Sequence, residues 1–136
     1  YWAGDRLGGE RVKGAYAYQQ LLKQNGWLPL GTDFPVEDIS PFKTFYAAVV
    51  RKDAKDWPAN GYQMENALTR EQALRGMTIW AAKANFEENE KGSLEKGKLA
   101  DFIILDNDLM KEVQEKLLQV MVLKTFLGGE KVYEKK

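Results

Sequence analysis

Apolar side chains recur every three or four positions in three stretches of this sequence, which is the spacing of one helix face. The spacing predicts helices over residues 11–25, 41–52 and 70–84. The apolar positions are Val12, Ala15, Tyr18 and Leu22 in the first; Phe42, Phe45, Tyr46 and Val49 in the second; and Leu74, Met77, Ala81 and Ala84 in the third. We interpret these stripes as core-facing surfaces, and the aromatic one as core rather than as a ligand platform.

Residues at the ends of these stretches support the same boundaries. Gly26 follows the first stretch as a C-cap. Ser40 and Pro41 open the second, because Ser suits the N-cap position and Pro the first helical position. Thr69 and Gln72 have the spacing of a capping box, which predicts the start of the third helix.

Continuous apolar runs between turn residues predict strands elsewhere in the chain. These runs are residues 27–32, 99–105, 120–127 and 131–133. Gly128 and Gly129 separate the last two as a tight hairpin turn, and a short helix is expected over residues 109–118. The pattern therefore predicts an α/β part followed by a small β part.

The stretch of residues 27–35, W-L-P-L-G-T-D-F-P, places Asp33 at the end of the first predicted strand. Ligands and catalytic groups gather at the carboxyl ends of parallel strands in α/β folds. Asp33 is therefore the candidate for chemistry. The alternative is that Asp33 caps the turn that follows it, since Asp is a common turn residue.

Composition limits the kinds of chemistry this chain can carry. It has 136 residues, enough for one modest domain, with 20 basic and 20 acidic side chains. This balance gives no electrostatic reason to expect nucleic acid or an anionic membrane as a partner. No apolar run is long enough to span a bilayer and no signal peptide is recognisable, and we expect a cytoplasmic location. The sequence contains neither His nor Cys, so metal or acid–base chemistry must use carboxylates, lysines or tyrosines.

Two polar segments resemble binding sites, but their features favour structural interpretations. Glu87, Glu88 and Glu90 form an acidic patch. We interpret it as solvated surface, because hard cations need ligands that converge from a fixed cage. Residues 92–98 are rich in Gly and Lys. They lack the G-x-x-x-x-G-K-[ST] pattern of a phosphate-binding loop, because a leucine follows the last lysine.

The first four residues, Y-W-A-G, place two large aromatic side chains at the end of the chain and lack an initiator Met. Natural N-termini are usually polar and loosely held. We interpret this end as a cut within something longer. The alternative is tag removal, or processing of a whole small protein.

Six motifs along the chain match the pattern of a single superfamily. They are R-L-G-G-E-R-x-x-G-A-Y-A at residues 6–17, G-T-D-F-P at 31–35, Y-A-A-V-x-R at 46–51, T-x-x-Q-A-L at 69–74, G-S-L-E-K-G-K-L-A-D-F-I-I-L-D at 92–106, and V-L-K-T-F-L-G-G-E-K-V-Y at 122–133. Together they resemble the C-terminal portion of the metal-dependent amidohydrolase superfamily. The motifs at 6–17 and 46–51 are similar to its amidohydrolase-3-like branch. The resemblance covers essentially the whole chain, and G-S-L-E-x-G-K-x-A-D is a specific element of it.

The resemblance implies an α/β fold made of the last strand and helices of a TIM-like (β/α) barrel, followed by C-terminal strands of a small composite β-sandwich. Residues 1–90 would form the C-terminal part of the barrel. Residues 91–136 would form the C-terminal segment of the β-sandwich domain. At the junction, the resemblance implies structural roles for Gly97 and Asp101, in turn geometry and backbone capping.

The resemblance also implies a role for Asp33. The family's metal ligands are several histidines and a lysine or glutamate on earlier strands, then one aspartate on the last strand, which matches Asp33. In the family this aspartate contacts the metal, zinc or another divalent ion, and takes a proton from the attacking water. The histidines have no counterpart here. A catalytic zinc needs about three protein ligands, so we expect no bound metal and no activity in this fragment alone.

Two functional hypotheses follow from these observations. In the first, the chain is a C-terminal fragment of a metal-dependent amidohydrolase that hydrolyses C–N bonds in a small-molecule, amide-type substrate. In the second, it is a structural or interaction module without catalysis. A single barrel strand with its helices leaves apolar faces uncovered, so we expect the fragment to self-associate. Strand exchange at open edges is one route for this association.

Overall fold

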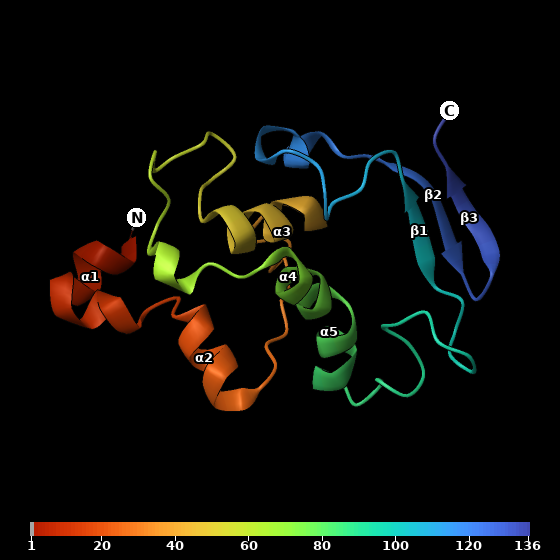
Figure 1. Cartoon of the computed structure of the whole chain (residues 1–136), viewed down its shortest axis with the longest axis horizontal. Coiled ribbons are helices and arrows are strands. Elements are labelled where there is room, and N and C mark those ends of the chain that lie inside the picture. Colours follow the sequence, from red (N-terminus) through yellow and green to blue (C-terminus); the bar gives the residue numbers. More distant parts are fainter. Residues whose placement is uncertain (1) are drawn as a thin grey trace.

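The computed structural model describes residues 2–136. The molecule is elongated, with helices along most of its length and a small sheet at the end opposite to α1 (Figure 1). The α-helices are α1 Trp2–Arg11, α2 Tyr18–Asn25, α3 Pro41–Val50, α4 Arg70–Met77 and α5 Ile79–Ala84. The 3₁₀ helices are η1 Val12–Gly14, η2 Met64–Asn66 and η3 Gln114–Gln119, and the strands are β1 Phe102–Leu105, β2 Val122–Leu127 and β3 Glu130–Glu134.

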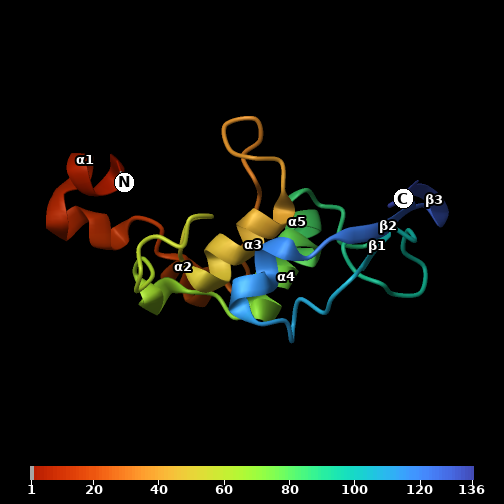
Figure 2. The ribbon, with the colours of Figure 1, turned by 90° about the horizontal axis from the view of Figure 1, so that it is seen from above.

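The hydrophobic core is built around α3. Phe45 of this helix is completely buried and Tyr46 nearly so, while Phe42 and Val49 pack against the same cluster. The predicted apolar stripe of this helix is therefore confirmed. Core residues from the rest of the chain are Leu22, Leu68, Ala73, Leu109, Leu117 and Val120. The segment after β1 thus returns to cover α3, as Figure 2 shows from above.

The predicted end of α2 and the predicted starts of α3 and α4 are confirmed. Gly26 adopts the left-handed conformation (φ 77°) at the end of α2, and its N–H donates to the carbonyl of Leu22. At α4, Thr69 Oγ1 accepts from the N–H of Gln72 at 3.1 Å, and Gln72 Oε1 accepts from the N–H of Thr69 at 2.9 Å. This is the reciprocal pairing of a capping box. Pro41 occupies the first turn of α3, although the Ser40 side chain makes no cap hydrogen bond.

The prediction of one helix over residues 11–25 is wrong in its first half. The chain forms η1, turns at Tyr16, and begins α2 only at Tyr18. Tyr16 has a φ of 58°, which a continuous right-handed helix does not contain. Its carbonyl accepts from the N–H of Tyr18 at 2.9 Å and from Arg51 Nη2 at 3.3 Å. A contact with a residue distant in sequence therefore holds the break, which local periodicity does not register.

The prediction of a strand over residues 27–32 is also wrong. The segment is not helical, but it pairs with no other strand among residues 2–136. One backbone bond attaches it to the helices, from the N–H of Leu30 to the carbonyl of Gly76 at 2.9 Å. A strand is defined by its neighbours, and the described part of the chain supplies none beside this segment.

The third predicted helix is divided into α4 and α5 at Thr78, whose φ and ψ are −123° and −96°. Its buried positions are the small residues Ala73, Gly76 and Ala82, which allow close approach to neighbouring segments. Of the predicted apolar stripe, Met77 is partly buried and packs against the core cluster, and none of the four residues is a buried member of it. Instead the four residues, Leu74, Met77, Ala81 and Ala84, line an open cavity of about 830 Å³ that faces the loop after α5 and the start of β1.

The three strands form one antiparallel sheet in the order β1-β2-β3, with Gly128 and Gly129 at the predicted hairpin turn. Phe102 on β1 pairs with Phe126 on β2, and their rings stack with centroids 4.5 Å apart. The predicted strands in this region are thus confirmed; the first two are shorter than predicted, and β3 is longer by one residue at each end. The predicted helix over residues 109–118 is replaced by turns and by η3. A second sheet, as a sandwich requires, is absent from residues 2–136.

Candidate functional site

Asp33 directly follows the extended segment 27–32, at the start of a loop that stands away from the helices (Figure 2). Behind the segment, Gly76 lies so close to Leu30 that a Cβ at residue 76 would be 2.7 Å from Leu30 Cγ. The hydrogen bond from Leu30 to Gly76 and this close packing fix the segment against α4. They also fix the point from which Asp33 projects.

The carboxylate of Asp33 is exposed and free of partners within the described residues. The turn that follows is closed by the main-chain carbonyl of Asp33, which accepts from the N–H groups of Val36 at 2.8 Å and Glu37 at 3.4 Å. Thr32 Oγ1, rather than the carboxylate, accepts from the N–H of Phe34 at 3.3 Å. The alternative of a capping carboxylate therefore has no geometric support, and the side chain is left available.

The backbone of Asp33 adopts the left-handed conformation, with a φ of 56°. This region is sparsely populated by residues other than Gly, although Asp and Asn enter it more readily than most. Such conformations cluster at sites where a side chain must be aimed in one direction. Other non-glycine residues of the described chain, among them Tyr16 and Arg51, share this conformation, so it does not by itself mark Asp33 as functional.

Within the acidic patch after α5, Glu87 has side-chain partners of its own. Glu87 accepts from Asn85 Nδ2 at 2.8 Å and pairs with Lys91 at 2.9 Å. The bond from Asn85 and the pairing with Lys91 hold the pKa of the Glu87 carboxyl below its usual value. No group of three or more His, Cys, Asp or Glu side chains within residues 2–136 could hold a metal ion. Asp33 therefore belongs to no group of three such side chains in the described part of the chain.

The Gly- and Lys-rich segment 92–98 has the structural role expected of it. Gly97 turns the chain with a φ of 95°. Lys98 pairs with Glu95 at 2.8 Å and donates to Ser93 Oγ at 2.6 Å, so its charge is used within the turn. Asp101 Oδ1 accepts from the N–H of Gly128, in the β2–β3 hairpin turn, at 2.7 Å. This bond is the backbone capping expected of Asp101.

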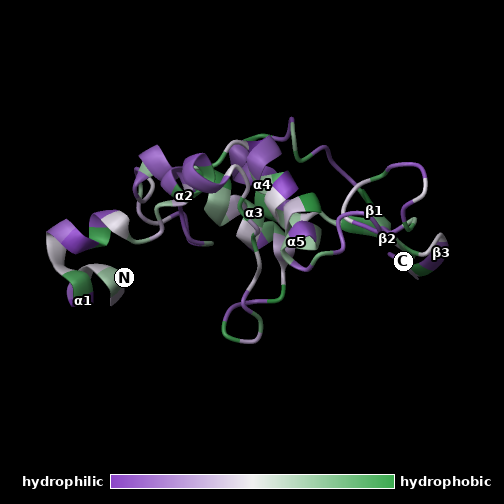
Figure 3. Cartoon of the chain, turned by 90° about the horizontal axis from the view of Figure 1, so that it is seen from below, coloured by the Kyte–Doolittle hydropathy of each residue, from purple (hydrophilic) through white to green (hydrophobic). Residues whose placement is uncertain are grey.

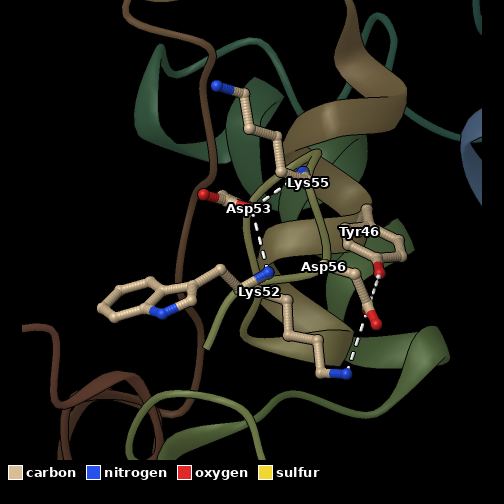
Figure 4. A network of polar contacts seen from close by, with 6 residues as sticks. Tyr46, Lys52, Asp53, Lys55 and Asp56 are labelled. Atoms are coloured by element: carbon tan, nitrogen blue, oxygen red, sulfur yellow. Dashed lines mark hydrogen bonds and ion pairs between the residues drawn. The ribbon is translucent and has the colours of Figure 1, made fainter. Parts of the chain in front are cut away.

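A polar network at the end of α3 was not predicted from the sequence (Figure 4). The Tyr46 hydroxyl and the Lys52 ammonium both donate to Asp56 Oδ1, at 3.1 and 3.0 Å. Lys52, and to a lesser extent Tyr46, hold the pKa of the Asp56 carboxyl below its usual value, while burial and Asp56 raise the pKa of Tyr46. Asp53 Oδ1 accepts from the N–H groups of Lys55 and Trp57. The spacing of these residues carries no recognisable signal, because their contacts depend on how the loop folds back.

Comparison with known families identifies the chain's relatives. Residues 1–133 match the amidohydrolase-3 family model, described as "Amidohydrolase family". The chain belongs to the amidohydrolase family. The resemblance read from the six sequence motifs is thereby confirmed, over nearly the same length of chain.

Individual relatives of this amidohydrolase-family chain come from plants and bacteria. It is 40% identical over 129 residues to Protein LONG AFTER FAR-RED 3 of Arabidopsis thaliana, covering 94% of this chain and 22% of that protein. It is 30% identical over 134 residues to the putative amidohydrolase YtcJ of Bacillus subtilis, covering 98% of this chain and 25% of that protein. It is also 30% identical over 134 residues to the N-substituted formamide deformylase of Arthrobacter pascens, covering 98% of this chain and 24% of that protein. The chain thus spans about a quarter of the length of these relatives.

A solved structure shows the same fold. The crystal structure of an amidohydrolase from Thermotoga maritima superposes with a TM-score of 0.66 at 21% sequence identity, covering 88% of this chain and 26% of that chain. The likeness supports a mixed α/β fold that corresponds to part of an amidohydrolase. The barrel as a whole and the composite sandwich remain predictions, as does the division at residues 90 and 91.

Proposed function

We propose that this chain is the C-terminal part of a metal-dependent amidohydrolase that hydrolyses C–N bonds of the amide type, with Asp33 as the general base at the metal site. The observation that carries the proposal is the family match over residues 1–133. The exposed carboxylate of Asp33, at the end of a fixed extended segment, supports the assignment of the residue. Family membership favours this hypothesis over an interaction module without catalysis.

The role of Asp33 is to move one proton. Its carboxylate accepts a proton from the water that attacks the substrate carbonyl, and the proton then passes to the leaving nitrogen as the C–N bond breaks. A carboxylate suits this step because it is ionised at neutral pH. A divalent metal in the complete enzyme would polarise the carbonyl of the substrate.

The residues of this chain do not by themselves fit a catalytic metal. A catalytic zinc needs about three protein ligands and an open position. The sequence has no His or Cys, and the described residues hold no suitable cluster of carboxylates. The remaining ligands would have to come from other parts of a longer polypeptide, and we propose that residues 1–136 alone are inactive.

The substrate class follows from a relative rather than from this structure. The Arthrobacter relative is called an N-substituted formamide deformylase, a name that specifies hydrolysis of an amide-type bond. We propose a small-molecule amide as the substrate here. Within the described residues, none of the helices is long and apolar enough to cross a membrane. The cytoplasmic location stays a prediction.

The complete reading frame that contains this chain tests the proposal. We expect its upstream part to encode His-x-His after a predicted strand, and its product to hydrolyse amides when purified with zinc. Asp33→Asn should lower kcat by about 10²–10⁴-fold, which is the usual contribution of a general base. The matched control is Asp108→Asn, a change in an exposed loop carboxylate outside the site. Upstream sequence without such histidines, or an Asp33→Asn enzyme of normal kcat, contradicts the proposal.

A further inference from the structure

Two asparagines in this chain are followed directly by glycine. Asn25-Gly26 stands at the end of α2, and Asn60-Gly61 lies in the loop between α3 and η2. In such a pair the main-chain nitrogen of Gly can lose its proton and attack the side-chain carbonyl carbon of Asn, because Gly has no Cβ to obstruct the approach. A new C–N bond forms and ammonia leaves, which gives a cyclic succinimide. Water then opens the ring at either carbonyl, and the residue becomes Asp or isoaspartate.

The structure holds Asn25 in place at several points. Asn25 is the last residue of α2, and its side-chain Nδ2 donates to the carbonyl of Trp27 at 3.1 Å. The attacking nitrogen of Gly26 is also engaged, because its N–H donates to the carbonyl of Leu22 at 2.8 Å. The reaction at Asn25 therefore needs the loss of a side-chain hydrogen bond and the unwinding of the last turn of α2.

Asn60 is held by fewer contacts. The loop of residues 51–63 extends from the end of α3 (Figure 1), and most of it is hydrophilic (Figure 3). Asn60 is exposed, and its side chain has no hydrogen-bond partner within residues 2–136. One main-chain bond closes the turn around it, from the N–H of Gly61 to the carbonyl of Pro58 at 2.8 Å. Local opening of this single turn releases the Gly61 nitrogen for the attack.

The fold requires glycine at residue 61. Its φ is 75°, and an added Cβ would overlap Met64 Sδ and lie 3.2 Å from the carbonyl oxygen of Val50. A larger residue, which would slow the reaction by obstructing the attack, is therefore disfavoured at this position. The packing around residue 61 thus maintains the reactive pair.

The residue after this pair anchors the end of α3. The N–H of Tyr62 donates to the carbonyl of Arg51 at 2.8 Å, and Arg51 Nε donates to the carbonyl of Tyr62 at 2.9 Å. Arg51 is the C-cap residue of α3 and is buried, with 7% of its surface exposed. An isoaspartate at residue 60 adds a CH₂ group to the main chain close to this anchor, so the two hydrogen bonds lose their alignment.

We propose that Asn60 is an autocatalytic modification site, at which the nitrogen of Gly61 displaces ammonia and water yields isoaspartate, and that Asn25 is protected by its contacts. The isoaspartate loosens the attachment of the loop to Arg51 and lowers the stability of the protein. This modification is independent of the proposed hydrolase function, since it needs only water and neither metal nor substrate.

The test compares the two pairs within one sample of residues 1–136. The folded protein is incubated in mildly alkaline buffer, digested with trypsin and analysed by mass spectrometry. Trypsin places Asn25 in the peptide of residues 24–43 and Asn60 in the peptide of residues 56–70, where fragmentation separates Asn60 from Asn66. Deamidation should be at least about fivefold faster at Asn60 than at Asn25, because at least one additional net hydrogen bond opposes the reaction at Asn25.

Two controls separate the effect of structure from that of sequence. In urea the contacts are lost, so the two rates should approach each other. Asn60→Gln should abolish the product at residue 60, because the longer side chain forms its ring far more slowly, and should leave the rate at Asn25 unchanged. Equal rates in the folded protein, or a faster reaction at Asn25, overturns the inference. A ratio that persists in urea overturns it too, because it assigns the difference to the neighbouring residues.

Thermal unfolding tests the consequence for stability. The fraction deamidated at residue 60, isolated by ion exchange and verified by peptide mapping, is compared with Asn60→Asp, which carries the same charge without the additional CH₂ group. The deamidated fraction should unfold at a lower temperature than the variant. Equal unfolding temperatures would overturn the claim that isoaspartate at residue 60 disturbs the anchor at Arg51.

Discussion

At the scale of single residues, Gly76 decides how closely the segment that carries Asp33 can approach α4. Its carbonyl accepts from the N–H of Leu30, and an added Cβ would lie 2.7 Å from Leu30 Cγ and 3.0 Å from the carbonyl oxygen of Leu28. Contacts this short force the segment to shift. The absence of a side chain at residue 76 is therefore part of what positions the candidate base.

Gly76→Ala should destabilise the protein although Ala is the better helix former. The substitution gains about 1 kcal/mol in helix propensity, whereas overpacking costs about 1–3 kcal/mol and displaces Leu30. Urea unfolding measures the net change. Gly4→Ala in α1 is the matched control, because nothing lies within 4 Å of the added Cβ, and it should be neutral or stabilising. Equal or greater stability of Gly76→Ala would contradict this account of the packing.

At the scale of elements, local signals in the sequence predict the starts of helices better than their packing. The capping box at Thr69 and the Pro at the start of α3 act within a few residues, so the sequence shows them directly. The break at Tyr16 depends on Arg51, 35 residues away, and the segment 27–32 lacks the neighbours that would make it a strand. The apolar stripe predicted for α4 and α5 is present in the sequence, but the fully buried residues of these helices are small ones on another face.

Two N-caps offer a comparison at this scale. Thr69→Ala should lower the free energy of unfolding by about 0.5–2 kcal/mol, because the Thr69 side chain accepts a hydrogen bond from the first turn of α4. Ser40→Ala should lower it less, because the Ser40 side chain makes no cap hydrogen bond to α3. Thermal unfolding of the two variants under one set of conditions measures the difference. A larger loss in Ser40→Ala would be at odds with the caps as described.

At the scale of the whole molecule, the described chain leaves much apolar surface uncovered. Ile103 and Ile104 of β1 are exposed, and the sheet has β1 and β3 as open edges. Exposed apolar strands at open edges favour association with another chain. The sequence predicted the family and Asp33 as a candidate, because the motifs are local. It did not predict which apolar side chains stay exposed, because exposure depends on how the whole chain folds.

Self-association of residues 1–136 is the expected result of this uncovered surface. Light scattering should give a mass that rises above the monomer value as the protein concentration increases. Ile103→Lys on β1 should lower the association, because a charge on an edge strand opposes pairing. Val113→Lys, at an exposed apolar residue outside the sheet, is the matched control and should have a smaller effect. A monomer at high concentration would count against this prediction.

The central claim is that residues 1–136 keep one carboxylate of a hydrolase metal site and supply no other ligand for it. Calorimetric titration of the chain with zinc tests this most directly, with Asp33→Ala as the paired variant. The account predicts no micromolar binding by either protein, because one carboxylate cannot replace about three ligands. Micromolar or tighter binding by the wild-type chain that disappears in Asp33→Ala would contradict the claim.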